Sequence, residues 1–181
     1  MTVRRVIRMG HPLLRETARP LDSAEIDSPW TQALVADMID TLADYGGIGL
    51  AAPQVAEPVR LAIIKISNGA SRYGDIPEIP LTVFVNPRIE VLDTETAGYW
   101  EGCLSVPGLR GFVERPQHVR VEYLDVKGHL QMMELKGFLA TVFQHEFDHL
   151  DGTLYIDRIT DTRLLSFDQE YERYLLPEQT I

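Results

Sequence analysis

The sequence predicts an α+β fold: mixed or antiparallel strands around one central helix, in a single domain. Three observations indicate this fold. Apolar residues recur at helical spacing in two long segments, about 29–45 and 137–150. Short apolar stretches bounded by glycine, proline and aspartate lie between them, as the strands of a sheet do. The chain has 181 residues, 45% of them hydrophobic, so residues 1–181 suit one core rather than two.

Charge and cysteine content narrow the functional class. The net charge of −10 argues against a broad surface for nucleic acid or anionic membrane, because such binding depends on clustered Lys and Arg. The one cysteine, Cys103, excludes an internal disulfide and fits a reducing compartment. No apolar run approaches the roughly 20 residues that span a bilayer. We therefore expect a soluble, intracellular protein without a broad surface for nucleic acid or membrane, although small basic patches remain possible.

The amino-terminal segment is basic. The first twenty residues hold five arginines and one glutamate, a bias that organelle transit peptides also show. They contain no serine, and the sequence from Met9 to Leu14 predicts a strand end that turns into a short apolar segment. We therefore expect a structural role for this segment.

The first long helix has clear signals at both ends. Ser28 can cap it, and Pro29 fits the first turn, where its missing N–H is no loss. Gly46 and Gly47 end it. One face is predicted to be core, with apolar residues at helical spacing: Leu34, Val35, Met38, Ile39, Leu42 and Tyr45.

The middle of the chain predicts strands. Asn86-Pro87 interrupts one of them, and the missing proline N–H there indicates an edge strand or a bulge. Residues 67–80, rich in Gly, Ser, Asp and Pro, indicate a surface loop. Residues 125–128, Asp-Val-Lys-Gly, predict a hairpin turn between two strands. The expected strands cover residues 59–66, 81–92, 119–124 and 130–135.

The second helix, about 137–150, carries the strongest chemical pattern. His145 and His149 are four residues apart, with Glu146 directly after the first. Positions i and i+4 share a helix face, so both imidazoles can point at one metal ion. Glu146, about 100° around the helix, can then handle the proton of a water at that site, which is hydrolase chemistry. The alternative is a buried helix that carries these residues for packing or pairing alone.

Two imidazoles leave a four-coordinate metal site incomplete, so a third donor is needed. Cys103 is a candidate, because its neighbours between Tyr99 and Pro107 include small and apolar residues that suit a partly buried thiolate. The alternative for a lone cysteine is a small buried hydrophobe.

Residues 47–54, Gly-Ile-Gly-Leu-Ala-Ala-Pro-Gln, form a run of small residues. Such a run lets backbone approach a ligand closely, and Gln54 can donate a hydrogen bond from a fixed place. The alternative is a linker between helix and strand. It is not a phosphate loop, because the Lys and Ser/Thr of that motif are missing.

Three segments together resemble the peptide deformylases: residues 47–54, Glu-Gly-Cys-Leu-Ser at 101–105 and Gln-His-Glu-Phe-Asp-His-Leu at 144–150. Residues 7–15 are also similar to the amino-terminal segment of that family, which argues against a cleaved leader. The resemblance implies a bacterial-type cytoplasmic hydrolase of protein biosynthesis. It would remove the N-formyl group from the initiating methionine of nascent chains and release formate.

The resemblance also implies residue roles. Cys103, His145 and His149 would be the metal ligands, and Glu146 the general acid and base. The family's metal is typically Fe²⁺, replaceable by Ni²⁺, Co²⁺ or Zn²⁺, so we expect one divalent ion per chain. The donor set alone would favour Zn²⁺ first, although thiolate and imidazole suit several divalent metals.

The substrate contacts follow from the same resemblance. Gln54 and the backbone N–H of Leu104 would hold the formyl oxygen as it becomes an oxyanion. Gly49 would line the cleft beside the substrate backbone. We expect the substrate methionine to enter an apolar pocket with walls from Ile48, Phe138, Leu139 and Val142.

One further contact is predicted beyond the ligands. Arg115 is expected to pair with Asp148 or Glu101 and so brace the ligand loop against the helix. The alternative is a set of solvated surface charges.

Two other functions remain open at this point. A metallopeptidase shares the helix motif, but it would cleave chain amides and ignore a formyl group. A metal-stabilised binding module would need four protein ligands, and no fourth donor is evident near these motifs.

The carboxyl-terminal tail departs from many members of the family, whose basic helix is thought to dock on the ribosome. Residues 161–181 hold two arginines against five carboxylates, so docking near the ribosome exit through a basic tail is in doubt. A second helical pattern is predicted there from Leu164, Leu165, Phe167, Tyr171, Tyr174 and Leu175.

Overall fold

The computed structural model describes residues 2–67, 69–71 and 74–176. Its main element is an antiparallel sheet with the order β1-β2-β5-β6-β7, and β8 also pairs with β6. The strands are β1 (Gly49–Ala51), β2 (Leu61–Ile66), β5 (Ile79–Cys103), β6 (Val106–Leu124), β7 (Leu130–Lys136) and β8 (Leu165–Phe167). A separate hairpin consists of β3 (Gly69–Ser71) and β4 (Gly74–Ile76).

Helices are fewer and mostly short. They are α1 (Ser23–Ile26), α2 (Pro29–Tyr45), α3 (Phe138–Asp148) and α4 (Asp168–Glu170). Short 3-10 turns cover Pro12–Arg15, Ala52–Val55, His149–Asp151, Tyr155–Arg158 and Thr162–Leu164, and a π-helical turn covers Tyr171–Leu175. Among the described residues, no helix is long and apolar enough to cross a membrane.

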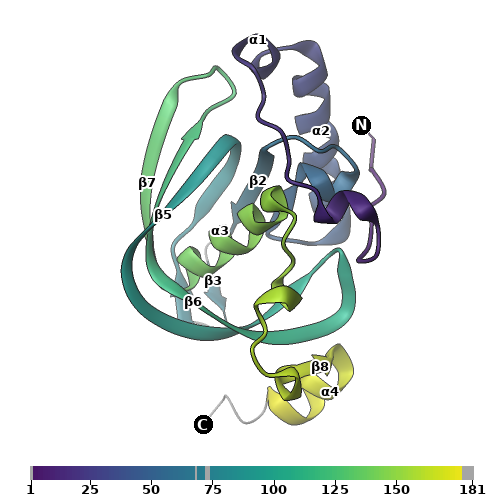
Figure 1. Cartoon of the computed structure of the whole chain (residues 1–181), viewed down its shortest axis with the longest axis vertical. Helices are drawn as coiled ribbons and strands as arrows, with labels where there is room; N and C mark the ends of the chain where they lie inside the picture. Colours follow the sequence, from purple (N-terminus) through teal and green to yellow (C-terminus); the bar gives the residue numbers. More distant parts are fainter. Residues whose placement is uncertain (1, 68, 72–73, 177–181) are drawn as a thin grey trace.

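The long strands β5 and β6 curve around α3 (Figure 1). Their pairing shifts register at several points, including between Val85 and Arg88 and between Glu101 and Cys103. Such bulges bend a strand and increase its twist, which lets the sheet fold around the helix. The predicted α+β fold with a central helix is therefore confirmed, with an antiparallel sheet.

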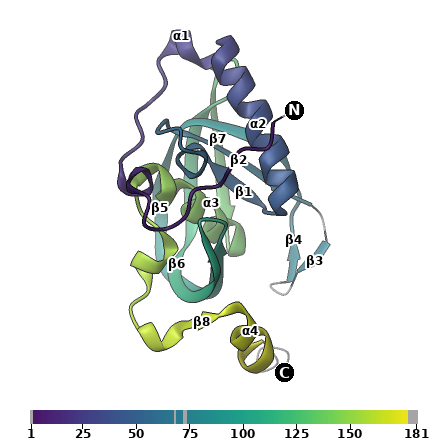
Figure 2. The same cartoon turned by 90° about the vertical axis from the view of Figure 1, so that its right-hand side faces the viewer.

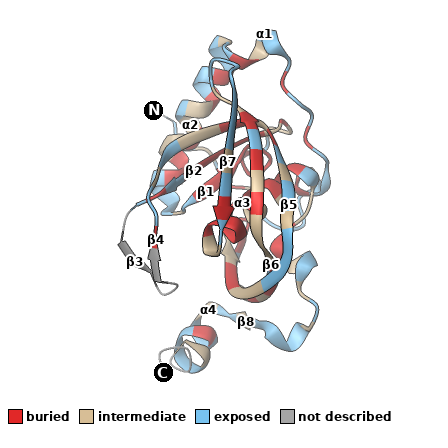
Figure 3. Ribbon diagram, turned by 90° about the vertical axis from the view of Figure 1, so that its left-hand side faces the viewer, coloured by how far each residue is buried: buried red, intermediate tan, exposed pale blue. Residues whose placement is uncertain are grey.

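Apolar side chains cover both faces of the sheet at β2. Ala62, Ile64 and Ile66 pack in the core that contains α3, whereas Leu61 and Ile63 pack in a second core with α2. Successive side chains of a strand point to opposite faces, which explains why β2 is apolar almost throughout. Along β6, by contrast, buried residues are interspersed with exposed and half-buried ones (Figure 3).

Helix α2 confirms the helix predicted over these residues. The Ser28 hydroxyl accepts the Thr31 N–H at 3.2 Å, and Gly46 ends the helix with a φ of 72°. Tyr45 differs from its prediction, because it is 41% exposed. The residues of the predicted face that are buried are Leu34, Met38 and Leu42.

The interruption at Asn86-Pro87 is a bulge and not an edge, because β5 lies between β2 and β6. Asn86 has a φ of 49°, a conformation that asparagine tolerates better than most residues. Its side-chain amide exchanges two hydrogen bonds with the backbone of Leu21, both at 2.8 Å. The bulge therefore attaches the amino-terminal part of the chain to the sheet.

Two segments differ from their predictions. The expected loop 67–80 contains β3 and β4, while residues 68 and 72–73 lie outside the described part. The predicted helical tail is interrupted: Thr162–Leu164 form a 3-10 turn, residues 165–167 pair with β6, and helical structure resumes at Asp168. Local sequence pattern did not reveal that pairing.

The amino-terminal segment also differs. Within the described chain, residues 2–9 lie in no strand, and Pro12–Arg15 form a 3-10 turn. The backbone N–H of Ile7 instead donates to the Gln54 carbonyl at 2.9 Å, and that of Met9 to the Ser105 carbonyl at 2.7 Å. These bonds place the segment beside two motifs that were singled out from the sequence.

Candidate active site

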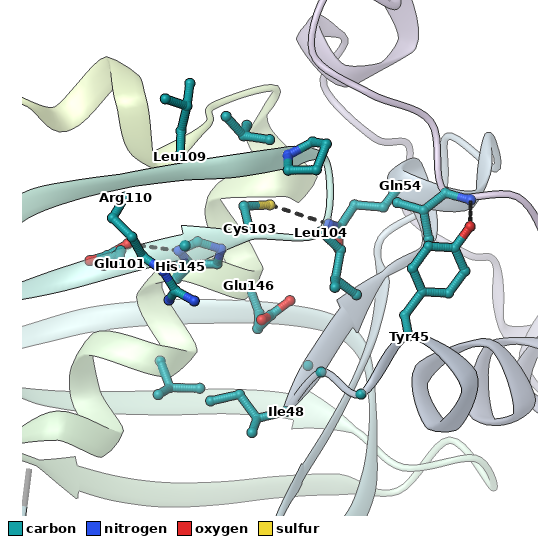
Figure 4. Close-up of a pocket in the computed structure, with 18 of the residues that line it drawn as sticks. Tyr45, Ile48, Gln54, Glu101, Cys103, Leu104, Leu109, Arg110, His145 and Glu146 are labelled. Atoms are coloured by element: carbon teal, nitrogen blue, oxygen red, sulfur yellow. Dashed lines mark hydrogen bonds and ion pairs between the residues drawn. The ribbon is translucent and has the colours of Figure 1, made fainter. Parts of the chain in front are cut away.

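A cavity of about 550 Å³ opens where three parts of the chain meet. They are the end of α2 with the residues leading into β1, the turn between β5 and β6, and one face of α3 from Phe138 to Glu146 (Figure 4). The volume is in the range of small-molecule and peptide pockets. All three segments that carried the family resemblance contribute residues to its wall.

Helix α3 and the turn after it carry three of the predicted site residues, the two histidines and the glutamate. His145 and Glu146 lie in its last turn, and His149 begins the 3-10 turn that continues it. The donor atoms of Cys103, His145 and His149 lie within 4.8 Å of one another, with Cys103 Sγ 3.3 Å from His149 Nε2. One sulfur and two imidazole nitrogens suit a divalent transition metal and leave a fourth position free.

The charges of Cys103, His145 and their neighbours shift one another's pKa values. Burial opposes ionisation of Cys103, but the two imidazoles outweigh it and hold the pKa of the thiol well below its ordinary value. Burial likewise opposes a charged His145, yet Cys103 and Glu101 raise the pKa of this ring well above its ordinary value. A thiolate beside the cationic His145 ring is a donor set whose protons a divalent ion can replace.

A buried ion-pair network supports the ligands. Glu101 Oε2 accepts the Nδ1–H of His145 at 2.7 Å, which leaves Nε2 for the ligand position. Arg115 binds Glu101 at 2.6 Å and Asp148 at 2.8 Å, so the predicted brace is confirmed with both partners. Burial raises the pKa of Glu101, but the bonds from His145 and Arg115 outweigh it and hold that pKa below its ordinary value.

Glu146 lies deep in the cavity, 6% exposed, and its Oε2 has no hydrogen-bond partner among the described residues. Burial raises the pKa of its carboxyl above the ordinary value, although the neighbouring imidazoles act in the opposite direction. Gly49 lies against it: a Cβ at this position would be 2.3 Å from Glu146 Cδ. The small residue predicted to border the cleft thus provides the space for the carboxylate.

Gln54 is held in one orientation. Its Oε1 accepts the Ala51 N–H at 2.9 Å, so its NH₂ group must face the cavity. That group donates to Ser105 Oγ at 3.1 Å and lies 3.5 Å from Cys103 Sγ. Gln54 is 2% exposed, so its amide is a fixed donor beside the ligand cluster rather than a linker residue on the surface.

The remaining predicted residues divide into two groups. Ile48, Leu104, Phe138 and Val142 line the cavity. Leu139 does not: it is buried in the core between α3 and the sheet, and its assignment to the pocket wall was wrong. On a helix it is rotated by about 100° from Phe138, which turns it away from the cavity.

Some lining residues were not predicted, notably Trp100, Arg110 and Asp168. Arg110 follows the cysteine motif by several residues along β6, and Asp168 belongs to the tail. No local pattern marks either one, because only the pairing of β8 with β6 brings them together. Ser105, which orients Gln54, had a signal, since it closes the Glu-Gly-Cys-Leu-Ser segment.

Comparison with known proteins agrees with this site. The family model described as polypeptide deformylase matches residues 3–164. Peptide deformylase 2 of Nostoc sp. is 44% identical over 167 residues, which are 92% of this chain and 92% of that protein. Peptide deformylase of Leptospira biflexa is 38% identical over 173 residues, 95% of this chain and 96% of that protein.

Solved structures show the same fold. The crystal structure of the class I type b peptide deformylase from Acinetobacter baumannii with bound Met-Ala-Ser has a TM-score of 0.82 and 39% sequence identity. The match covers 87% of this chain and 99% of that one. With the family model matching most of the chain, these likenesses decide among the functions left open by the sequence. The chain belongs to the peptide deformylases, metal-dependent hydrolases that remove the N-formyl group from nascent chains.

Proposed function

We propose that Cys103, His145 and His149 hold one divalent ion, and that Glu146 is the proton-transfer group of the deformylation. The observation that carries this assignment is the buried Glu146 oxygen without a partner, next to three converging donors. A buried carboxylate oxygen left unpaired is costly, so a group in the reaction should occupy that place.

A divalent ion in this position would supply Lewis acidity, by lowering the pKa of a bound water and polarising the formyl carbonyl. We propose Fe²⁺, on the family resemblance, with Zn²⁺, Ni²⁺ and Co²⁺ as substitutes. The sulfur and two imidazoles suit all four ions, and availability then decides which is bound.

Glu146 transfers the proton of the reaction between the attacking water and the leaving nitrogen. Glu146 accepts the proton of the attacking water and returns it to the methionine nitrogen as the bond between that nitrogen and the formyl carbon breaks. The water oxygen leaves in formate. The raised pKa of Glu146 suits both halves of this transfer, because a base and acid in turn works best near the ambient pH.

The oxyanion that forms on the formyl oxygen needs fixed donors. Gln54 supplies one, because Ala51 and Ser105 hold its amide so that a hydrogen is directed at the ligand cluster. The backbone N–H of Leu104, directly after Cys103, supplies the second. Gly49 then borders the substrate backbone.

The methionine side chain occupies the apolar part of the cavity, against Ile48, Phe138 and Val142. The Acinetobacter baumannii structure carries Met-Ala-Ser, a peptide with the sequence of a deformylated chain start, which supports a substrate of this class for the present chain.

The cellular setting is also part of the proposal. The enzyme acts in the cytoplasm on nascent chains, as one catalytic domain over residues 1–181. Its tail is acidic and partly paired with β6, which argues against docking near the ribosome exit through a basic tail.

The test uses protein purified without oxygen. It should contain about one divalent ion per chain, and it should release formate from formyl-Met-Ala-Ser but no acetate from acetyl-Met-Ala-Ser. Cleavage of an internal amide with the formyl group intact, or formate release that survives complete removal of metal by a chelator, would contradict the proposal.

A further inference from the structure

We propose that the tail from Leu165 to Leu175 forms part of the peptide cleft, and that Asp168 sets which substrate charges the outer rim accepts. By pairing with Arg110, Asp168 matches the positive charge that Arg110 would otherwise present to the side chains following the formyl-methionine. This inference rests on the proposed function, and it adds a specificity-determining residue to it.

The backbone attaches the tail to the cavity wall. Strand β8 pairs antiparallel with β6, with Arg110 opposite Ser166 and Leu109 opposite Phe167. Both residues of β6 line the cavity. Figures 1 and 2 both show β8 and α4 below the curved part of β6, and the paired residues, 109–111, lie near the start of that strand. The tail therefore extends the sheet at the cavity, although it is more than fifty residues away in sequence.

A buried aromatic contact fixes the tail beyond β8. Tyr171 is 1% exposed, and its ring centre lies 5.1 Å from that of Trp100. Trp100 lines the cavity and is itself 8% exposed. Burial of two large rings makes this segment a part of the fold rather than a loose extension.

The side chain of Arg110 lies against the end of β5, the strand that ends at Cys103. A Cβ at Gly102 would be 2.6 Å from Arg110 Nη1, so the guanidinium lies against backbone one residue before Cys103. Its Nε donates to Asp168 Oδ1 at 2.8 Å. The side chains of Arg110 and Asp168 are 30% and 39% exposed, and both residues line the cavity. The pair is therefore accessible to a peptide that leaves the cleft.

The charge of this rim depends on Asp168. With the carboxylate present, the positive charge of Arg110 is matched at hydrogen-bond distance. Without it, Arg110 would present a full positive charge next to the substrate, in addition to the exposed Arg8 that also lines the cavity. A charge at an exposed rim changes the rate of encounter with charged ligands, and salt screens the effect.

The experiment compares two amidated peptides, formyl-Met-Ala-Glu and formyl-Met-Ala-Lys, by kcat/KM at low ionic strength. The ratio of the two values in the native holoenzyme is the reference, because Arg8 contributes to it equally in every variant. In Asp168→Asn, the ratio of the Glu peptide to the Lys peptide should rise by about fivefold or more, and fall back at roughly 0.5 M salt.

Matched variants separate this effect from a loss of structure. Asp168→Glu keeps the charge and should keep the native ratio. Arg110→Gln combined with Asp168→Asn removes both charges of the pair and should restore the native ratio. Glu172→Gln removes an exposed carboxylate of the same tail outside the cavity wall and should leave the ratio unchanged.

Three results would overturn the inference: an unchanged ratio in Asp168→Asn, an equal loss for both peptides, or the same shift from Glu172→Gln. A native enzyme that deformylates neither peptide would instead overturn the proposed function itself. The two failures are therefore distinguishable.

Discussion

The two sides of the cavity use the same kind of ion pair in different surroundings. On the ligand side, the Arg115 and Glu101 side chains are 4% and 6% exposed, and the pair holds a ligand imidazole in place. On the tail side, Arg110 and Asp168 are 30% and 39% exposed and hold no ligand. When a buried pair loses one partner, the remaining charge is cut off from water, whereas water solvates the charge that an exposed pair leaves behind. The buried pair on the ligand side therefore fixes the position of His145, whereas the exposed pair on the tail side can change the charge of the cavity rim at little cost in stability.

The largest effect is expected on the ligand side, at Glu146. Glu146→Ala should lower turnover on the order of 10² to 10⁴-fold, because it removes the group that moves the proton. Its metal content should stay near one per chain, since Glu146 is not a proposed ligand.

Cys103→Ala is the matched variant for Glu146→Ala. It should lose metal as well as activity, because it removes a ligand. Metal analysis beside formate release distinguishes the two variants. A metal-free Glu146→Ala, or one that is metal-loaded and near the native rate, would refute the assignment of roles.

The second largest effect is expected at Arg115, which pairs with Glu101 and Asp148 behind the ligands. Arg115→Met should lower the free energy of unfolding by about 3–5 kcal/mol, because it leaves Glu101 and Asp148 without their buried partner. Metal affinity should fall roughly 10 to 100-fold through the freed His145. Thermal unfolding and metal titration measure the two effects.

The control for Arg115 is Arg158→Gln, which removes the half-exposed second partner of Asp148. It should cost no more than about 1 kcal/mol. Equal unfolding temperatures for the two variants would show that burial does not distinguish these arginines.

A smaller loss is expected at the oxyanion donor. Gln54→Leu should lower turnover on the order of 10²-fold with metal content unchanged, because one fixed hydrogen-bond donor is lost. Ser105→Ala should cost less, since it removes a partner that orients the amide but leaves the amide itself. Formate release and metal analysis test both. Native activity in Gln54→Leu would reduce Gln54 to a structural residue.

The smallest effect on stability belongs to the tail side. Asp168→Asn should change the free energy of unfolding by no more than about 1 kcal/mol, because its ion pair is substantially exposed. Chemical denaturation measures this. A loss as large as that of Arg115→Met would mean that the tail pair is structural, and the contrast between the two sides would disappear.

The sequence pattern of a few neighbouring residues was sufficient to predict the elements whose structure depends only on those neighbours. The spacing of His145 and His149 places both rings on one helix face whatever surrounds the helix. Ser28 and Gly46 end α2 through caps that act within a few residues. For Arg115 the sequence left Asp148 and Glu101 as alternatives, and the structure pairs it with both.

Sequence alone determined the helix that carries the imidazoles, the chemistry of the donors and the family. Tertiary structure decided that Leu139 packs in the core, that Gly49 makes room for Glu146, and that Asp168 reaches Arg110. These contacts join distant parts of the chain, and they depend on strand register and on the bulges that curve β5 and β6. Register is set by the packing of the whole sheet, so no short stretch of sequence contains it.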